Sequence, residues 1–131
     1  MKIAADTNVL VRAVVRDDKM QAEVAARVLR NASLVAVAVS GLCEFVWVLR
    51  RKYGLPAAEV AAAIRVLLAA GNVEVDRPAV AVGLTMLDAG GDFADGVIAY
   101  EGRWLGAETF VSFDKKAVEM LAAQGVSARL L

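Results

Sequence analysis

Short apolar runs alternate with longer amphipathic segments along the chain, and this alternation predicts an α/β fold. Residues 3–5 form an apolar run that stops abruptly at Asp6-Thr7-Asn8, as a buried strand does where it ends. Further short apolar runs, each expected to be a strand, lie at 34–39, 73–75, 109–112 and 127–130. The segments between them repeat apolar residues at helical spacing.

Seven helices are expected between these strands, at 9–15, 20–30, 42–52, 56–71, 78–87, 93–105 and 115–124. Asp18, Ser40 and Asp92 each precede one of them and are expected to cap it. Strands separated by one or two helices favour a mostly parallel sheet with helices on both faces, a three-layer sandwich. No linker or repeat interrupts the pattern, so residues 1–131 are expected to form a single domain.

The amino-acid composition restricts both the expected cellular location and the possible catalytic chemistry. The hydrophobic fraction is 59%, yet no apolar run approaches the roughly 18 residues of a membrane helix, and Asp6 and Arg12 interrupt any leader-like N-terminus. The one cysteine, Cys43, suits a reducing compartment, so we expect a cytoplasmic protein without a membrane partner. The chain has no histidine, which excludes Ser-His-Asp and Cys-His catalysis and leaves carboxylates, with or without a hard metal ion.

Acidic residues follow the expected strands or begin the expected helices. Asp6 and Asp114 each follow a strand, and Asp92 and Asp95 stand three apart at a helix start. Helix capping explains Asp6, Asp92 or Asp114 as readily as catalysis does, but it explains Asp95 less well. Glu44 falls among apolar residues in the first turn of its helix, where a buried carboxylate needs a partner or a cation. The alternative is a solvent-facing glutamate.

One edge of a parallel sheet would collect all four positions, Asp6, Glu44, Asp95 and Asp114. Two carboxylates about 4 Å apart repel by roughly 4 kcal/mol at an effective dielectric constant near 20, so four require protonation or a cation. Oxygen ligands alone favour Mg²⁺ or Mn²⁺, and such ions activate water for phosphodiester cleavage.

These residues carry a resemblance to a known family. The chain resembles the PIN domain, and within that family the VapC-type toxins of toxin–antitoxin pairs. The resemblance rests on four motifs in order: a strand followed by Asp6-Thr7-Asn8, Ser40 with Glu44, Asp92-Phe-Ala-Asp95, and Ser112-Phe-Asp114. The resemblance spans nearly the whole chain. Ser112 stands where many relatives carry threonine, which keeps a hydroxyl at that position.

The resemblance implies a parallel sheet with the first strand central and a Mg²⁺-dependent endoribonuclease. It also implies a homodimer inhibited by a cognate antitoxin, for which the helices at 42–52 and 56–70 offer surplus apolar surface. Asp6, Glu44, Asp95 and Asp114 would be the metal-binding catalytic acids, with Asp92 as an auxiliary metal ligand. Asn8 would orient Asp6 or a water molecule, and Ser112 would be a second auxiliary residue.

Contacts with RNA are expected from three basic residues near these acids, Arg12, Lys115 and Lys116. Trp47 and Trp104 are expected as core or interface anchors. Two other classes place aspartates at strand ends, namely receiver-type phosphoacceptor domains and haloacid-dehalogenase-like phosphatases, which need Asp-x-Asp where this chain has Asp6-Thr7-Asn8. A non-catalytic PIN-like module that only binds RNA or a partner is the remaining alternative.

Overall fold

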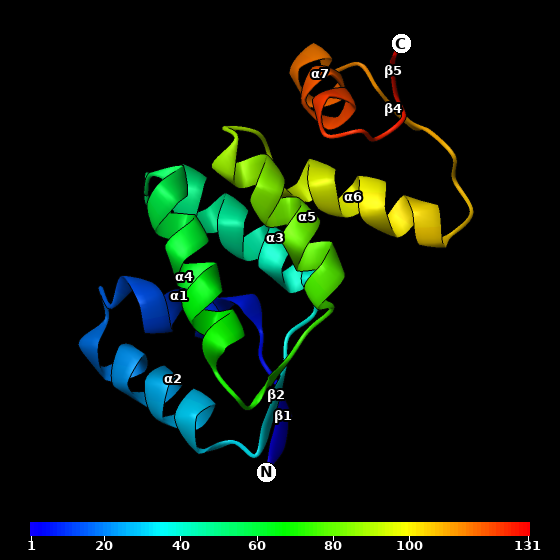
Figure 1. Cartoon of the computed structure of the whole chain (residues 1–131). Coiled ribbons are helices and arrows are strands. Elements are labelled where there is room, and N and C mark those ends of the chain that lie inside the picture. The colour runs from blue at the N-terminus through cyan, green and yellow to red at the C-terminus, as the bar shows by residue number, and fades with distance from the viewer. The chain divides into compact units, whose positions relative to one another are not determined.

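The structure, a computed structural model, describes all 131 residues and divides them into two compact units, Met1–Asp76 and Arg77–Leu131 (Figure 1). Both contain parallel strands linked by helices, so the α/β class predicted from the sequence is confirmed. No helix combines the length and the apolar character that crossing a bilayer requires.

The first unit is built on a three-stranded parallel sheet of β1 (Lys2–Ala4), β2 (Leu34–Ala36) and β3 (Val73–Glu74). Ile3 pairs with Val35, and Val35 pairs with Val73. Helices α1 (Thr7–Val15) and α2 (Lys19–Asn31) connect β1 to β2. The connection from β2 to β3 consists of α3 (Val39–Trp47), the π-helical turn η1 (Val48–Lys52) and α4 (Ala57–Ala69).

Within the first unit the strands are ordered β1-β2-β3, so β2 is the middle strand of this three-stranded sheet. Val35 and Val37 are buried, whereas Lys2 and Ala4 on β1 are exposed. The strand with the more buried apolar side chains therefore takes the middle position, which a list of apolar runs does not reveal.

The core of the first unit lies on the inner faces of α3, η1 and α4. Its largest fully buried side chains are Leu42, Phe45, Leu49, Val60 and Ile64. Helix α3 begins at Val39, and Ala38 occupies its N-cap without a side-chain hydrogen bond, so the expectation that Ser40 caps this helix is wrong. The earlier start adds Val39 to the buried face one turn before Leu42.

The second unit consists of α5 (Arg77–Asp88), α6 (Phe93–Trp104), β4 (Phe110–Ser112), α7 (Lys115–Ala123) and β5 (Ala128–Leu130). Strands β4 and β5 form a two-stranded parallel sheet, with Phe110 opposite Ala128, and α7 connects them. Met86, Ala99 and Leu121, from α5, α6 and α7, form a buried cluster in this unit.

Two glycines allow α5 and α6 to pack closely. A Cβ added to Gly96 would lie 2.8 Å from the Val82 carbonyl oxygen, and one added to Gly83 would lie 2.6 Å from the Phe93 ring. Real Cβ contacts of that length do not occur, so only glycine fits where backbone faces backbone at Gly96. The close packing fixes the first turn of α6, which carries Asp95.

Both tryptophans lie on the surface. Trp47 on α3 is 61% exposed and Trp104 on α6 is 78% exposed. The expectation that they are core anchors is therefore wrong, and a role at an interface stays a prediction.

Candidate functional site

Asp6 lies at the junction of β1 and α1, as the sequence predicts. Its backbone is extended, it is the N-cap of α1, and its Oδ1 accepts a hydrogen bond of 2.7 Å from the Thr7 amide. The residue is exposed. Capping engages one carboxylate oxygen, so the other is available to a ligand.

Thr7 connects this junction to α3. It is the buried polar residue of the molecule, and its hydroxyl donates to the Gly41 carbonyl at 3.0 Å and to Glu44 Oε2 at 3.3 Å. The first unit thus brings the Glu44 carboxylate to the residue that follows Asp6. Sequence reasoning missed Thr7, although it stands in the polar trio that ends β1, and a hydroxyl buried there needs a hydrogen-bond partner.

Glu44 is exposed, so the expectation of a buried carboxylate at this position is wrong. The helix buries Leu42 and Phe45 and turns Glu44 outward between them. Its Oε2 accepts a hydrogen bond from the Thr7 hydroxyl at 3.3 Å. Because α3 begins at Val39, Glu44 lies beyond the first turn of the helix, and the expectation that it stands in the first turn is wrong.

The second unit holds the other three acids. Asp92 caps α6 by accepting a hydrogen bond from the Ala94 amide at 3.0 Å, and Asp114 caps α7 by accepting one from the Ala117 amide at 3.1 Å. Asp95 caps neither helix and lies in the first turn of α6. Capping therefore accounts for Asp92 and Asp114 but not for Asp95.

The acids of the second unit interact electrostatically. Burial raises the pKa of Asp95 above its ordinary value, and the negative charges of Asp92 and Asp114 raise it further. Both causes oppose ionisation of Asp95. A nearby positive charge would have the opposite effect and would favour the ionised form of Asp95.

The two auxiliary residues differ in their contacts. Ser112 Oγ accepts a hydrogen bond of 2.9 Å from the Asp114 amide and so helps to fix the turn that presents Asp114. Asn8 is exposed and lines an open groove between α1 and α2, while the hydrogen bond of Asp6 comes from Thr7. A contact between Asn8 and a water molecule stays a prediction.

The three basic residues expected to contact RNA differ in how far they are already engaged. The Arg12 guanidinium forms an ion pair of 2.6 Å with Asp17, so it is already engaged. Asp17 Oδ2 also accepts a hydrogen bond from the Tyr53 hydroxyl. Lys115 reaches Glu119 at 3.8 Å with both side chains largely exposed, and Lys116 is exposed. The two lysines are the freer candidates.

The chemistry of the donors fits a hard divalent cation. All the candidate ligands are carboxylates, and neither imidazole nor paired thiolates are present. Neither unit alone gathers three or more such groups closely enough to hold an ion. The first unit carries two of the candidate acids, Asp6 and Glu44, and the second carries three, Asp92, Asp95 and Asp114.

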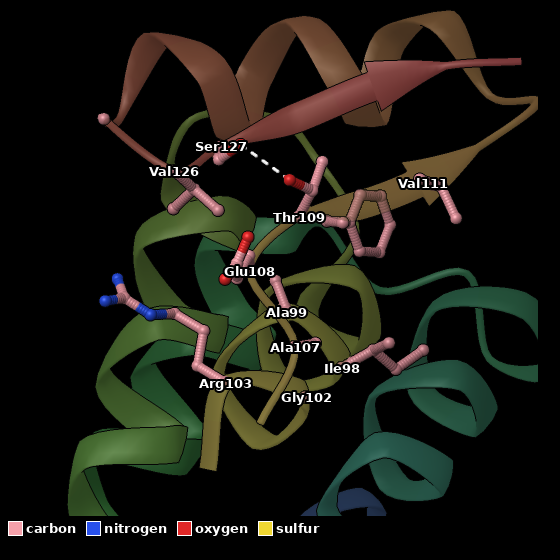
Figure 2. A pocket seen from close by; sticks show the side chains of 12 residues that line it. Ile98, Ala99, Gly102, Arg103, Ala107, Glu108, Thr109, Val111, Val126 and Ser127 are labelled. Atoms are coloured by element: carbon pink, nitrogen blue, oxygen red, sulfur yellow. Dashed lines mark hydrogen bonds between the residues drawn. The ribbon is translucent and has the colours of Figure 1, made fainter. Parts of the chain in front are cut away.

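An open cavity of about 380 Å³ lies in the second unit, between the end of α6 and the two strands (Figure 2). Ile98, Arg103 and Glu108 line it, and the Thr109 and Ser127 hydroxyls lie 3.0 Å apart at its rim. None of the candidate acids lines this cavity, so it is separate from the candidate site.

Comparison with known proteins identifies the family. The family model described as PIN domain matches residues 3–121, a segment that contains every candidate acid. Members of this family are typically nucleases that act on nucleic acids and generally use divalent metal ions. No individual curated protein is similar enough to count as a relative. The match replaces the receiver-type and phosphatase interpretations, and because it covers far more than half of the chain, the protein belongs to the PIN domain family.

Proposed function

We propose that this PIN domain is a Mg²⁺- or Mn²⁺-dependent endoribonuclease. The observation that carries the proposal is the presence of four acids within the family match, with Asp6, Asp95 and Asp114 at helix starts and Glu44 inside α3. The raised pKa of Asp95 supports it, because a carboxylate held beside like charges gains most from a cation.

The proposed catalytic acids have separate supporting contacts. Thr7 holds the Glu44 carboxylate through its hydroxyl, and Ser112 holds the backbone of Asp114. Asp92 keeps its role as the cap of α6 and serves as an auxiliary metal ligand. A bound divalent ion would supply the positive charge that stabilises the phosphodiester transition state and lowers the pKa of an attacking water.

We further propose that residues 1–131 act as one PIN-like domain, because the family match runs from residue 3 to residue 121 and crosses the boundary between the two units. Each of the four proposed acids is then needed for cleavage. Either variant, Glu44→Gln or Asp95→Asn, should abolish activity by itself.

The proposed biological role is that of a VapC-type toxin, a cytoplasmic homodimer inhibited by a cognate antitoxin. An interface on the helices expected to form the dimer is supported by their exposed apolar side chains. These are Trp47 on α3 and Val66 on α4, the latter 73% exposed. Light scattering at tens of micromolar tests the dimer, with Trp47→Ser as the variant expected to be monomeric. A wild-type monomer would contradict it.

The nuclease is tested by incubating the full chain with structured and unstructured RNAs in Mg²⁺, in Mn²⁺ or in EDTA. We expect cleavage with either ion and none in EDTA. Asp18→Asn is the matched control, because Asp18 caps α2 outside the candidate site and should be dispensable. Cleavage that persists unchanged in EDTA contradicts the metal mechanism, and RNA binding without cleavage supports the non-catalytic PIN-like module instead.

A further inference from the structure

Phe113 differs from the other phenylalanines of the chain in its exposure. Phe45 and Phe93 are buried and Phe110 is partly buried, but Phe113 is 83% exposed. An exposed benzyl group forgoes the free energy that burial in the core would give. A function outside the core is therefore the more economical explanation for its position between Ser112 and Asp114.

The backbone on both sides of Phe113 is held in place. Ser112 Oγ accepts a hydrogen bond from the Asp114 amide at 2.9 Å, and the Ser112 carbonyl accepts one from the Leu131 amide at 2.9 Å. Asp114 is fixed in turn by its hydrogen bond from the Ala117 amide. The exposed ring thus stands on an ordered turn, so that little conformational freedom is lost when it binds a ligand.

Two lysines follow directly. Lys115 and Lys116 occupy the first turn of α7, where the helix dipole disfavours positive charge. The only ion pair there is the loose, exposed contact of Lys115 with Glu119 at 3.8 Å, which contributes little. Helix stability therefore does not explain these lysines, whereas a polyanion next to the turn does.

An ordered, exposed aromatic ring beside two cations is the combination by which proteins bind single-stranded nucleic acid, through stacking on a base and contacts with phosphates. We propose that Phe113 stacks on an unpaired base of the RNA substrate and that Lys116 contacts an adjacent phosphate. The inference rests on the proposed nuclease function and restricts its substrate to RNA that is unpaired at the bound nucleotide. In a duplex the same base face is covered by its neighbours.

The test measures binding of a fluorescein-labelled oligouridylate to the full chain by anisotropy, in an Asp95→Asn background that prevents cleavage. Phe113→Leu keeps an apolar side chain but removes the aromatic face, and the affinity should fall about five- to a hundredfold. Phe113→Tyr should bind within about twofold of the parent because it keeps the face. Trp104→Leu, the loss of another exposed aromatic in the same unit, should have no effect.

The dependence on salt separates stacking from charge. Lys116→Gln should reduce the slope of log K against log salt by about 0.7, the value for one phosphate contact on a single strand, and Phe113→Leu should leave the slope unchanged. Equal losses from Phe113→Leu and Trp104→Leu overturn the stacking assignment. The stacking assignment is also overturned if the Phe113→Leu variant binds RNA with normal affinity, even if its oligomeric state or its melting temperature changes.

Failure of this inference can be told apart from failure of the nuclease proposal. If the wild-type chain cleaves RNA and Phe113→Leu cleaves and binds it equally well, stacking is refuted and the nuclease stands. If binding depends on Phe113 but no metal ion supports cleavage, stacking stands and the nuclease is refuted.

Discussion

The hydroxyl of Thr7 lies 3.3 Å from Glu44 Oε2 and 3.0 Å from the Gly41 carbonyl, and it shares its single proton between them. This contact joins the start of α1 to α3 across 37 positions of sequence. The hydroxyl of Thr7 thus holds the Glu44 carboxylate, while the backbone amide of the same residue donates a hydrogen bond to Asp6 Oδ1.

Replacing Thr7 with valine should loosen Glu44 and destabilise the fold. The shape is kept, but the Gly41 carbonyl and the Glu44 carboxylate each lose the hydrogen bond from the hydroxyl, and we expect a loss of about 1–2 kcal/mol in the free energy of unfolding. Mg²⁺-dependent cleavage should fall as well. Thr7→Ser keeps the hydroxyl and should retain most of both properties. Urea unfolding and RNA cleavage check the pair, and equal behaviour of the valine and serine variants would show that the hydroxyl is not needed.

Asp95 should make stability depend on pH and on metal. Its folded-state pKa is raised above the ordinary value of 3.8, so the folded state binds the proton more tightly than the unfolded state does. The favourable contribution is complete below the unfolded pKa and is lost as pH rises through the folded pKa. At pH 7 in EDTA, Asp95→Asn should therefore melt higher than the wild type, by about one to three degrees.

The difference should shrink as pH falls through the raised folded-state pKa of Asp95, because the carboxyl group then takes up its proton and loses its charge. Mg²⁺ should raise the melting temperature of the wild type and leave that of Asp95→Asn nearly unchanged. Asp18→Asn provides the control outside the acid cluster. A lower melting temperature for Asp95→Asn in EDTA at neutral pH would show that its charge stabilises the fold.

Local signals in the sequence predicted the helix starts well. Asp18, Asp92 and Asp114 each stand before an apolar-periodic segment, and each accepts a hydrogen bond from an amide of the helix that follows. Ser40 also stands before an apolar-periodic segment, but it does not cap α3. The helix begins one residue earlier, at the buried Val39. Capping depends on neighbours in sequence, and tertiary packing overrides it where an apolar residue competes.

Long-range relationships were less predictable. The target of the Thr7 hydroxyl on α3 is distant in sequence, and so is the strand that pairs with β1. Periodicity describes one element at a time and contains no information about which edges meet. The candidate acids were therefore identified by residue type and by their places at strand and helix ends, while the contacts that hold them required the structure.

Gly96 should be intolerant of a side chain although it lies in a helix. A Cβ there would lie 2.8 Å from the Val82 carbonyl, and a helix backbone cannot give way as a flexible side chain can. Gly96→Ala should cost about 1–3 kcal/mol of stability. Gly102, in the same helix, has only Ala107 Cβ at 3.8 Å, so Gly102→Ala should be neutral or stabilising by up to about 1 kcal/mol. Equal effects of the two substitutions in urea unfolding would contradict close packing of α5 and α6.

Replacing the candidate acids with their amides separates metal ligands from helix caps. Asp6, Asp92 and Asp114 each accept a hydrogen bond at a helix start, and asparagine caps a helix about as well as aspartate does. The Asp→Asn variants should therefore stay folded, with melting temperatures in EDTA close to that of the wild type. A carboxylate that holds a cation behaves differently, because the amide keeps the shape and loses the charge.

Mg²⁺-dependent RNA cleavage should fall roughly a hundredfold or more in each of four variants, Asp6→Asn, Asp95→Asn, Asp114→Asn and Glu44→Gln. The effect of Asp92→Asn should be milder. Thermal melts with and without Mg²⁺, run beside cleavage assays for all five variants, decide the roles. If Asp92→Asn loses activity and Asp95→Asn keeps it, the roles of these two residues are reversed. If all five variants cleave RNA normally, none of these carboxylates holds the metal ion, and the proposed nuclease site must lie elsewhere in the chain.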